Sequence, residues 1–341
     1  MKAVIYKGIN NYEVIKNSQE PIINELLNVK VKIEYCGICG SDIHKLLFEK
    51  PNEDYVKTQI LGHEITGVVV EMLQNVKTVK LGDRVVIEPL LYCNSCNMCK
   101  SGHIQFCDNL KSLGKDFPGG FAEYITVNER QLYKIENTTS MKVATLSDPY
   151  SVAIHIKNMI NNNKYSRIAI IGDGIIGLAC AELLGNNDEV IVFGKHENRL
   201  DILNKINVKY LDIMKVYDYS NYFDVVIEAV GGRQHNTLEN AINICEKKGK
   251  ILIAGVYDNN FKFNISLRNA FYKELSIIGC NSFEKENNIS EFKLALDFLS
   301  NKSKIADNLV SKIYGISEFN EAIEYIKDRK ENNCIKVMIK M

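Results

Sequence analysis

The chain has 341 residues, of which 46% are hydrophobic and 25% charged; this composition is that of a folded globular protein and excludes a largely disordered chain. Its 42 Lys and Arg residues balance 42 Asp and Glu residues, so the net charge provides no long-range attraction for nucleic acid or an anionic membrane. The N-terminus has no long apolar run of the signal-peptide kind, and no apolar stretch reaches about 18 residues, so we expect a cytoplasmic protein with neither a nucleic-acid nor a membrane partner.

The chain is longer than one typical domain, so two domains are expected. Residues 1–150 contain short β-rich runs separated by Gly and Asn, at 30–35, 67–72, 84–87 and 122–127. This pattern predicts a small β-barrel with inserted loops.

A metal site with an open position is indicated by two motifs in this half. Cys39 begins C-G-S-D-I-H, and His63 and Glu64 follow in G-H-E. A catalytic zinc has three protein ligands of the thiolate, imidazole or carboxylate type and keeps a fourth position free. Cys39 and His63 supply two ligands; the third is expected from Asp148 in L-S-D-P-Y, with Glu64 as an alternative or exchanging ligand. An Asp-Pro turn and a buried His-Glu pair are the structural alternatives.

Such a metal suits the oxidation of an alcohol, because zinc lowers the pKa of bound water from roughly 16 to about 7 and a bound alcohol should respond similarly. Ser41 and His44, in the same loop as Cys39, are candidates for passing the proton to solvent. Asp42 is a candidate acceptor for the imidazole of His63. The structural alternatives are that Ser41 caps a helix beginning at Asp42 and that His44 is a surface residue.

Four cysteines form a second cluster in a lobe at about 90–110. Cys93, Cys96, Cys99 and Cys107 have the spacing C-x2-C-x2-C-x7-C, and four thiolates close a tetrahedral zinc shell with no open position. We therefore expect two zinc ions per chain, one catalytic and one structural. The remaining cysteines (Cys36, Cys180, Cys245, Cys280 and Cys334) and His103, His155 and His235 are interpreted as packing or surface residues.

Residues 151–284 alternate strands and helices. Apolar strands at 167–171, 189–195, 223–232 and 250–256 are separated by helical segments, which predicts a doubly wound parallel sheet. Residues 285–341 contain two helices and a final strand, and we expect them to rejoin the first domain.

A dinucleotide site is indicated at the start of this second domain. Gly172, Gly174 and Gly177 form G-x-G-x-x-G between an expected strand and a helix that opens with Ile175 and Ile176. This setting lets the backbone approach a pyrophosphate at the helix N-terminus.

The end of the next strand favours NADP over NAD. NAD sites carry an acidic residue there, which binds the ribose 2'-hydroxyl. Here the stretch reads V-F-G-K-H, so the position of the acidic residue is taken by Gly194. Lys195, His196 and Arg199 could instead surround a 2'-phosphate. The alternative is that these three basic side chains form a solvated face.

The nicotinamide end of the cofactor is expected at the ends of two further strands. The candidates there are Val230, Gly231, Gly255 and Val256.

With these motifs in this order, the chain resembles the zinc-containing medium-chain dehydrogenase/reductase superfamily over essentially its full length. The resemblance implies an α/β fold with a GroES-like β-barrel catalytic domain, formed by 1–150 and 285–341, and a Rossmann domain, formed by 151–284. It also implies the metal and proton-transfer roles given above, and a homodimer or homotetramer that pairs edge strands near 274–280.

The segment D-P-Y-S-V-A-I-H looks like the polyol dehydrogenase branch, where Glu is usual in place of Asp148. The leading hypothesis is a zinc-dependent transfer of hydride between NAD(P) and a secondary alcohol or polyol. The cofactor half also looks like ribitol-5-phosphate dehydrogenases, so a sugar-phosphate polyol dehydrogenase is the first alternative, with Lys45, Lys50, Lys57 and Arg268 as candidate phosphate ligands. A non-catalytic cofactor-binding zinc protein is the alternative from another class.

Overall fold

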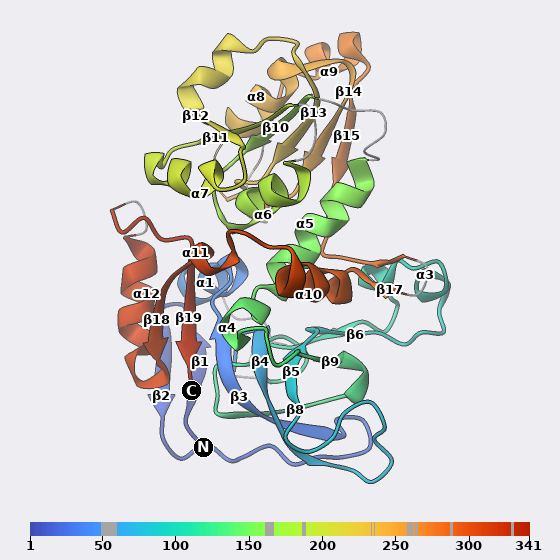
Figure 1. Ribbon diagram of the computed structural model, residues 1–341, viewed down its shortest axis with the longest axis vertical. Coiled ribbons are helices and arrows are strands. Elements are labelled where there is room, and N and C mark those ends of the chain that lie inside the picture. The colour runs from blue at the N-terminus through green and yellow to red at the C-terminus, as the bar shows by residue number, and fades with distance from the viewer. Residues whose placement is uncertain are drawn as a thin grey trace. The chain divides into compact units, whose positions relative to one another are not determined.

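The protein is described here by a computed structural model, which places residues 1–48, 60–160, 167–185, 189–232, 234, 236–257, 262, 265–286, 289–328 and 331–341. It divides into two compact units (Figure 1). The first unit consists of Met1–Asp148, Glu284–Lys302 and Ala306–Met341, and the second of Pro149–Phe283 and Ser303–Ile305. The C-terminal segment therefore returns to the unit in which the chain begins.

A seven-stranded sheet forms the centre of the first unit. Its order is β18-β19-β3-β4-β5-β9, with β8 also paired to β3, and every pair is antiparallel except β18 with β19. The strands are β3 (Val29–Gly37), β4 (Glu64–Met72), β5 (Arg84–Ile87), β8 (Tyr124–Val127), β9 (Leu132–Lys134), β18 (Val310–Gly315) and β19 (Lys336–Lys340).

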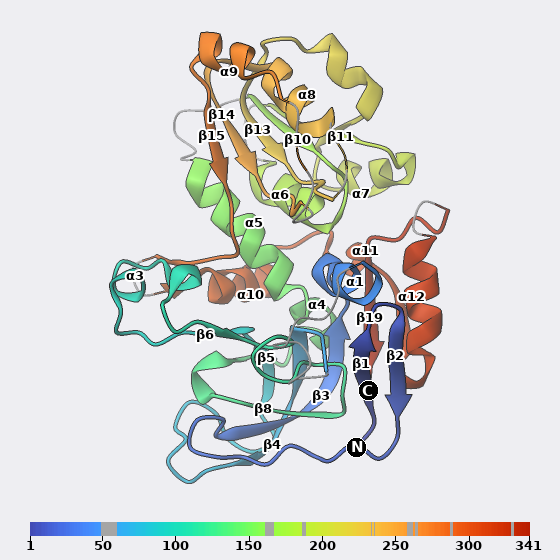
Figure 2. The same ribbon diagram turned by 180° about the vertical axis from the view of Figure 1, so that it is seen from behind.

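Three two-stranded sheets and several short helices complete the first unit (Figure 2). The paired strands are β1 (Ala3–Gly8) with β2 (Asn11–Ile15), β6 (Leu90–Leu91) with β7 (Lys111–Ser112), and β16 (Lys285–Glu286) with β17 (Ile289–Ser290). The helices are α1 (Gly40–Leu47), α3 (Asn97–Lys100), α4 (Met141–Ala144), α10 (Glu291–Asn301), α11 (Ala306–Leu309), α12 (Phe319–Lys327) and the 3-10 turns η1 (Ile104–Phe106), η2 (Glu129–Gln131) and η5 (Ile316–Glu318).

Alternating residues of the sheet build the core of the first unit. Val29, Val31 and Ile33 of β3 are buried, with less buried residues between them, as expected for a strand with one face against the core. Aromatic packing holds the C-terminal segment against this core. The ring of Phe319 in α12 packs edge-on against the ring of Phe121, with 5.1 Å between the ring centroids.

The second unit is built on a six-stranded parallel sheet of order β12-β11-β10-β13-β14-β15. Its strands are β10 (Arg167–Ile171), β11 (Glu189–Gly194), β12 (Lys209–Asp212), β13 (Phe223–Glu228), β14 (Cys245–Ile253) and β15 (Ser276–Gly279). The central strand β10 is an apolar run buried after its first residue, which is typical of a parallel sheet covered on both faces.

One helix of this unit precedes its first strand, and the others lie between its strands. These helices are α5 (Ser147–Ile160, in this unit from Pro149), α6 (Ile175–Leu184), η3 (Glu197–Arg199), α7 (Leu200–Asn204), η4 (Ile213–Asp218), α8 (Asn236–Ile244) and α9 (Leu267–Lys273). Helix α6 packs on β10 and β11, and α8 packs on β13 and β14 (Figure 1). This architecture confirms the expected fold class of a β-barrel domain with a Rossmann sheet.

Within the described residues, no helix combines the length and apolar character that crossing a bilayer requires.

Candidate active site

The residues of the open metal site come together at one end of the first unit's sheet. Cys39 follows β3 as the N-cap residue of α1, and Glu64 is the first residue of β4. Because β3 and β4 are neighbours with Gly37 opposite Glu64, the two motifs meet although some two dozen residues separate them. Ligand atoms of Cys39, His63 and Glu64 lie within 4.8 Å of one another.

Two glycines make room for this arrangement. Gly62 has a φ of +91°, which residues with a side chain rarely adopt, and a Cβ there would lie 2.8 Å from Sγ of Cys36. A Cβ on Gly37 would lie 2.0 Å from Oε2 of Glu64. The backbone conformation directly before His63 therefore requires Gly62, and the position of the Glu64 carboxylate requires Gly37.

Asp148, the second residue of α5, also reaches the cluster. Its Oδ2 lies 3.9 Å from Nε2 of His63. Burial raises the pKa of the Asp148 carboxyl to about 6, partly opposed by His63. Two carboxylates, Asp148 and Glu64, are thus available beside one thiol and one imidazole, which is a donor set that fits zinc.

Glu64 already has a cationic partner that sequence reasoning missed. Nζ of Lys336, the first residue of β19, lies 2.6 and 2.8 Å from the two carboxylate oxygens, and it also donates to the carbonyl of Ile38 at 3.1 Å. Lys336 is only 3% exposed. The signal in the sequence was a lysine at the start of an apolar final strand.

Asp42 lies on the Nδ1 side of the His63 ring. Its carboxylate accepts hydrogen bonds from the backbone N–H groups of Cys39 at 3.0 Å and Gly62 at 3.2 Å, and it lies 3.7 Å from Nδ1 of His63. Burial alone would lower the pKa of the His63 imidazole, but Asp42 and Cys39 outweigh it and raise the pKa well above its usual value. Asp42 thus ties together the two segments that carry the expected ligands.

The proposed proton-transfer residues lie on α1. The helix begins at Gly40 with Cys39 as its N-cap, so the alternative that Ser41 caps a helix starting at Asp42 is wrong. Ser41 is exposed, and His44 is partly buried three residues later, on the same helical face.

The four cysteines of the lobe converge as their spacing predicts. Their sulfur atoms lie within 4.8 Å of one another, with Sγ of Cys93 3.5 Å from Cys107 and 3.9 Å from Cys99. Four sulfurs bound to one zinc at about 2.3 Å lie about 3.8 Å apart in a tetrahedron. The lobe therefore has the dimensions of a closed zinc–thiolate site.

Electrostatics in the lobe also favour a cation. Hydrogen bonds from the Ser95 hydroxyl and the Ser95 and Cys96 amides lower the pKa of the Cys93 thiol to about 5. Burial and neighbouring thiols raise the pKa of Cys99 to about 12. Zinc binds the thiolate form, so the lowered pKa of Cys93 favours a cation at this position.

The glycine-rich loop has the form of a pyrophosphate cradle. Gly172 has a φ of +117°, and a Cβ on Gly177 would lie 2.0 Å from the carbonyl oxygen of Gly172, so the loop packs directly on the helix. A Cβ on Gly174, the N-cap of α6, would meet no described atom within 4 Å. Ile175 and Ile176 form the first turn of α6. Open space in front of a helix N-terminus fits a dinucleotide phosphate.

The basic residues after β11 do not behave alike. Lys195 is exposed and His196 is partly buried, whereas Arg199 is only 2% exposed. The interpretation of three exposed basic side chains is therefore wrong for Arg199, because the turn of η3 into α7 directs its side chain inward.

Asp173, inside the glycine-rich loop, is a second residue that sequence reasoning missed. It accepts hydrogen bonds from the backbone N–H groups of Lys195 and His196, each at 2.9 Å. An acidic residue within G-x-G-x-x-G was the available signal.

The expected nicotinamide-end residues lie at the ends of β13 and β14. A Cβ on Gly231 would lie 2.4 Å from the carbonyl oxygen of Val256, and Gly232 donates its N–H to that oxygen at 2.8 Å. Val230 and Val256 are 47% and 84% exposed. Gly255 therefore lies where the segments that follow β13 and β14 contact each other.

Two of the candidate phosphate ligands, Lys50 and Lys57, lie outside the described residues. His235, which was interpreted as a packing or surface residue, also lies outside them. Lys45 is partly buried on α1, and Arg268 stacks on the ring of Tyr272 at 5.2 Å within α9.

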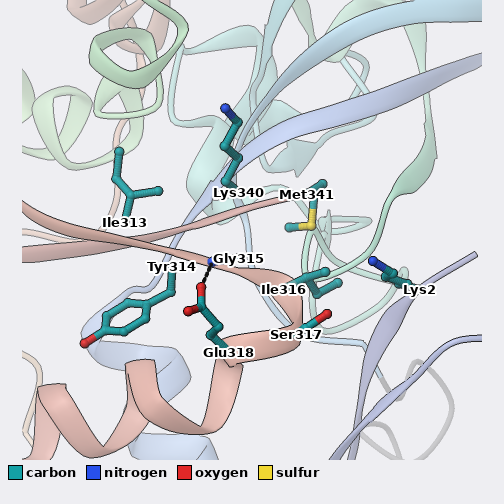
Figure 3. Close-up of a pocket in the computed structure, with 9 residues that line it drawn as sticks. All are labelled: Lys2, Ile313, Tyr314, Gly315, Ile316, Ser317, Glu318, Lys340 and Met341. Carbon is teal, nitrogen blue, oxygen red and sulfur yellow. Dashed lines mark hydrogen bonds between the residues drawn. The ribbon is translucent and has the colours of Figure 1, made fainter.

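A hollow of about 440 Å³ lies at a different place in the first unit (Figure 3). It is bordered by Lys2, η5 and the ends of β18 and β19, and Glu318 accepts a hydrogen bond from the backbone N–H of Gly315 there at 2.8 Å. Its lining includes none of the expected site residues.

Comparison with known proteins links both units to one family. The model of the alcohol dehydrogenase GroES-like domain matches residues 27–137, and that of zinc-binding dehydrogenases matches residues 172–301. D-arabinitol dehydrogenase 1 of Uromyces fabae is 32% identical, over 100% of this chain and 97% of the relative. D-arabitol-phosphate dehydrogenase of Enterococcus avium is 28% identical, over 91% of this chain and 89% of the relative.

Among solved structures, a zinc-binding dehydrogenase from Sinorhizobium meliloti 1021, bound to NADP, superposes with a TM-score of 0.84 at 26% identity. The match covers 100% of this chain and 99% of that one.

Proposed function

Because the chain belongs to the zinc-containing medium-chain dehydrogenase/reductase superfamily, in its alcohol and polyol branch, we propose that it interconverts a secondary alcohol of a free polyol and the matching ketone. It is an NAD(P)-linked dehydrogenase, so the hydride passes to or from the nicotinamide. The observation that carries the proposal is the cluster of Cys39, His63 and a buried carboxylate at one sheet end.

A zinc ion at this cluster supplies the acidity that an alcohol lacks near neutral pH. Cys39 and His63 are the ligands in our proposal, and Asp42 orients the imidazole. In this proposal Ser41 accepts the proton of the alcohol, and His44, three residues later in α1, passes it to solvent.

Asp148 is the third ligand in our proposal. Glu64 has both oxygens engaged by Lys336, so its charge is already compensated. Asp148 supplies a second carboxylate at this position, with its Oδ2 3.9 Å from Nε2 of His63. Glu64 remains close enough to exchange with it.

The four-cysteine lobe holds a second, structural zinc in this proposal, giving two ions per chain. The Sγ separations of 3.5 and 3.9 Å support it. With four thiolates the shell is closed, so this ion stabilises the lobe and takes no part in turnover.

NADP is the proposed cofactor. The support is that β11 ends in Gly194 without a carboxylate and continues with Lys195 and His196. The Sinorhizobium protein of the same fold was solved bound to NADP.

A phosphorylated polyol is the second candidate substrate. The similarity to the D-arabitol-phosphate dehydrogenase of Enterococcus avium favours it. It requires cations beside the substrate, for which Lys45 and Arg268 are the described candidates.

We further propose a cytoplasmic homodimer or homotetramer. All ten cysteines are free, which suits a reducing compartment. Strand β15 is an edge of the parallel sheet, and nearby Phe271 and Tyr272 are 76% and 66% exposed, so a second copy can extend the sheet and cover these rings.

Replacement of Cys39 by Ser tests the proposal. We expect the zinc content of purified protein to fall from two ions per chain to one and turnover to disappear, with an unchanged circular dichroism spectrum. Cys334→Ser, outside both clusters, is the control. Two zinc ions and full turnover in Cys39→Ser would contradict the proposed site.

The substrate class is tested with free polyols, sugar phosphates and simple alcohols, each with both nicotinamides. Turnover of a polyol phosphate alone would replace the free polyol by the second candidate. Turnover with none of them in a two-zinc, cofactor-binding protein would favour the non-catalytic alternative.

A further inference from the structure

We propose that Asp173 is a positioning residue that makes the protein select NADP, because it holds His196 and the backbone after β11 in the arrangement that receives the 2'-phosphate. The inference rests on the proposed use of NADP and assigns that preference to a residue outside the strand end where cofactor choice is usually read.

The carboxylate of Asp173 bridges three segments of the second unit. It accepts hydrogen bonds from the N–H groups of Lys195 and His196 after β11, from Nδ1 of His196 at 2.9 Å, and from the hydroxyl of Tyr210 in β12 at 3.3 Å. Asp173 itself stands between Gly172 and Gly174 and is 7% exposed. The pyrophosphate loop and the ribose loop are therefore tied together by one side chain.

This carboxylate and an acidic residue at position 194 exclude each other. A Cβ on Gly194 would lie 2.3 Å from Oδ2 and 2.7 Å from Cβ of Asp173, so a side chain at position 194 requires Asp173 to move. The strand end where NAD sites carry their carboxylate must thus remain glycine as long as Asp173 occupies this space. The Asp173 carboxylate thus occupies the space that the acidic side chain of an NAD site would need.

Asp173 has most of its acceptor positions engaged within the protein. Its Oδ2 accepts from two amides and the Tyr210 hydroxyl, and its Oδ1 accepts from Nδ1 of His196, which leaves one acceptor position on Oδ1. A ribose hydroxyl would have to share that oxygen with His196. The Asp173 carboxylate is thus engaged mainly by donors of the protein itself.

The consequence for His196 follows from hydrogen-bond chemistry. An ionised carboxylate only accepts, so Nδ1 of His196 must carry the hydrogen. Nε2 of the oriented ring then donates to a phosphate when the ring is an imidazolium, because the neutral ring presents an acceptor there. The two amide bonds also fix the backbone from which the exposed Lys195 side chain extends. Two groups able to bind a phosphate are thereby held next to the expected ribose position.

The opposing effect is repulsion between Asp173 and the phosphate. Four donors and low exposure shield the carboxylate, so we expect the loss of orientation to exceed the relief of repulsion when the charge is removed. The two effects predict opposite changes in NADPH affinity, which makes the inference testable.

The experiment measures dissociation constants of NADPH and NADH for the zinc-loaded full chain by isothermal titration calorimetry, without an alcohol. The variants are Asp173→Asn, His196→Ala and the double variant, with circular dichroism as a check of folding. Asp212→Asn is the matched control, because Asp212 ends the neighbouring strand β12 and caps η4 through the N–H of Met214.

We expect Asp173→Asn and His196→Ala each to weaken NADPH binding about tenfold or more and NADH binding by less than about threefold, since one charge-assisted hydrogen bond accounts for that factor. The double variant should bind NADPH more tightly than the product of the two single effects predicts, because Asp173 acts in large part through His196. Asp212→Asn should leave both constants unchanged.

Equal weakening of both cofactors, tighter NADPH binding by Asp173→Asn, or additive effects in the double variant would overturn the inference. If Asp173→Asn fails to fold, an unchanged NADPH constant in His196→Ala overturns it by itself. A wild-type protein that prefers NADH overturns the proposed cofactor, and this result is separate because it requires no variant.

Discussion

Lys336 and Glu64 form an ion pair that is almost completely removed from solvent, with side chains 3% and 1% exposed. Removing one partner leaves an uncompensated charge in the interior, which costs about 3–5 kcal/mol. We therefore expect Lys336→Ala to lower the free energy of unfolding by about that amount in a urea titration. Lys340→Ala, an exposed lysine of the same strand, should change it by less than about 0.5 kcal/mol. Similar losses in both variants would contradict this account.

Glu88, directly after β5, is a buried acid that sequence reasoning missed. Its Oε2 accepts hydrogen bonds from the hydroxyls of Tyr133 at 2.7 Å and Ser290 at 3.1 Å, and burial raises its pKa to about 7. A raised carboxyl pKa stabilises the folded state below the unfolded pKa of 4.5, and this contribution is lost as the pH rises through about 7.

Glu88→Gln should remove that pH dependence. We expect the stability of the variant relative to the native chain to increase by roughly 2 kcal/mol between about pH 5 and about pH 8, because a shift of one pKa unit corresponds to about 1.4 kcal/mol. Urea unfolding at both pH values measures it. A constant difference between the two proteins would show that Glu88 does not titrate in this range.

At the scale of elements, the four-cysteine lobe should depend on its metal. Cys99→Ser removes one of four thiolates, and we expect one zinc per chain to be lost and the lobe to become sensitive to limited proteolysis at about 90–110. Met98→Ala, an exposed neighbour in α3, is the control and should retain both ions. A Cys99→Ser protein with two zinc ions would disprove the structural site.

Elements with a strong local signal were predicted well. The expected strands 84–87 and 167–171 coincide with β5 and β10, because each is an apolar run after an initial arginine. The cysteine lobe was equally clear, since its ligands lie within one short segment and spacing alone brings them together.

The contacts that sequence reasoning missed join distant segments. Lys336 meets Glu64 only through the pairing of β19 with β3 and of β3 with β4, and Asp173 meets His196 only through the alignment of β10 with β11. Arg199 was predicted to surround a 2'-phosphate, with a solvated face as the alternative, and its burial was missed because a helix start read in isolation does not reveal which way its side chains point. Sheet register, which no local pattern specifies, determined the first two contacts.

At the scale of the whole molecule, association through β15 is the proposal with the widest consequences. Ile277 in this edge strand is 36% exposed, and a charge there disfavours pairing with a second copy. We expect light scattering to give a dimer or tetramer for the native chain and a monomer for Ile277→Lys. Ile313→Lys, at the edge strand β18 of the other sheet and 38% exposed, should leave the mass unchanged. A monomeric native chain would contradict the proposal.

The pairing of Lys336 with Glu64 also has a consequence in time. The two residues are 272 positions apart, so a ribosome adding about 5–20 residues per second needs roughly a quarter of a minute to a minute between them. Throughout that interval Glu64 lacks its lysine, and the Tyr35–Gly37 part of β3 lacks the strand that β19 later provides, whereas β8 already pairs with Val29–Lys32 on the same edge. Metal loading is therefore best completed after translation has passed β19, and a chaperone that shields the exposed edge of β3 should increase the yield of zinc-loaded protein.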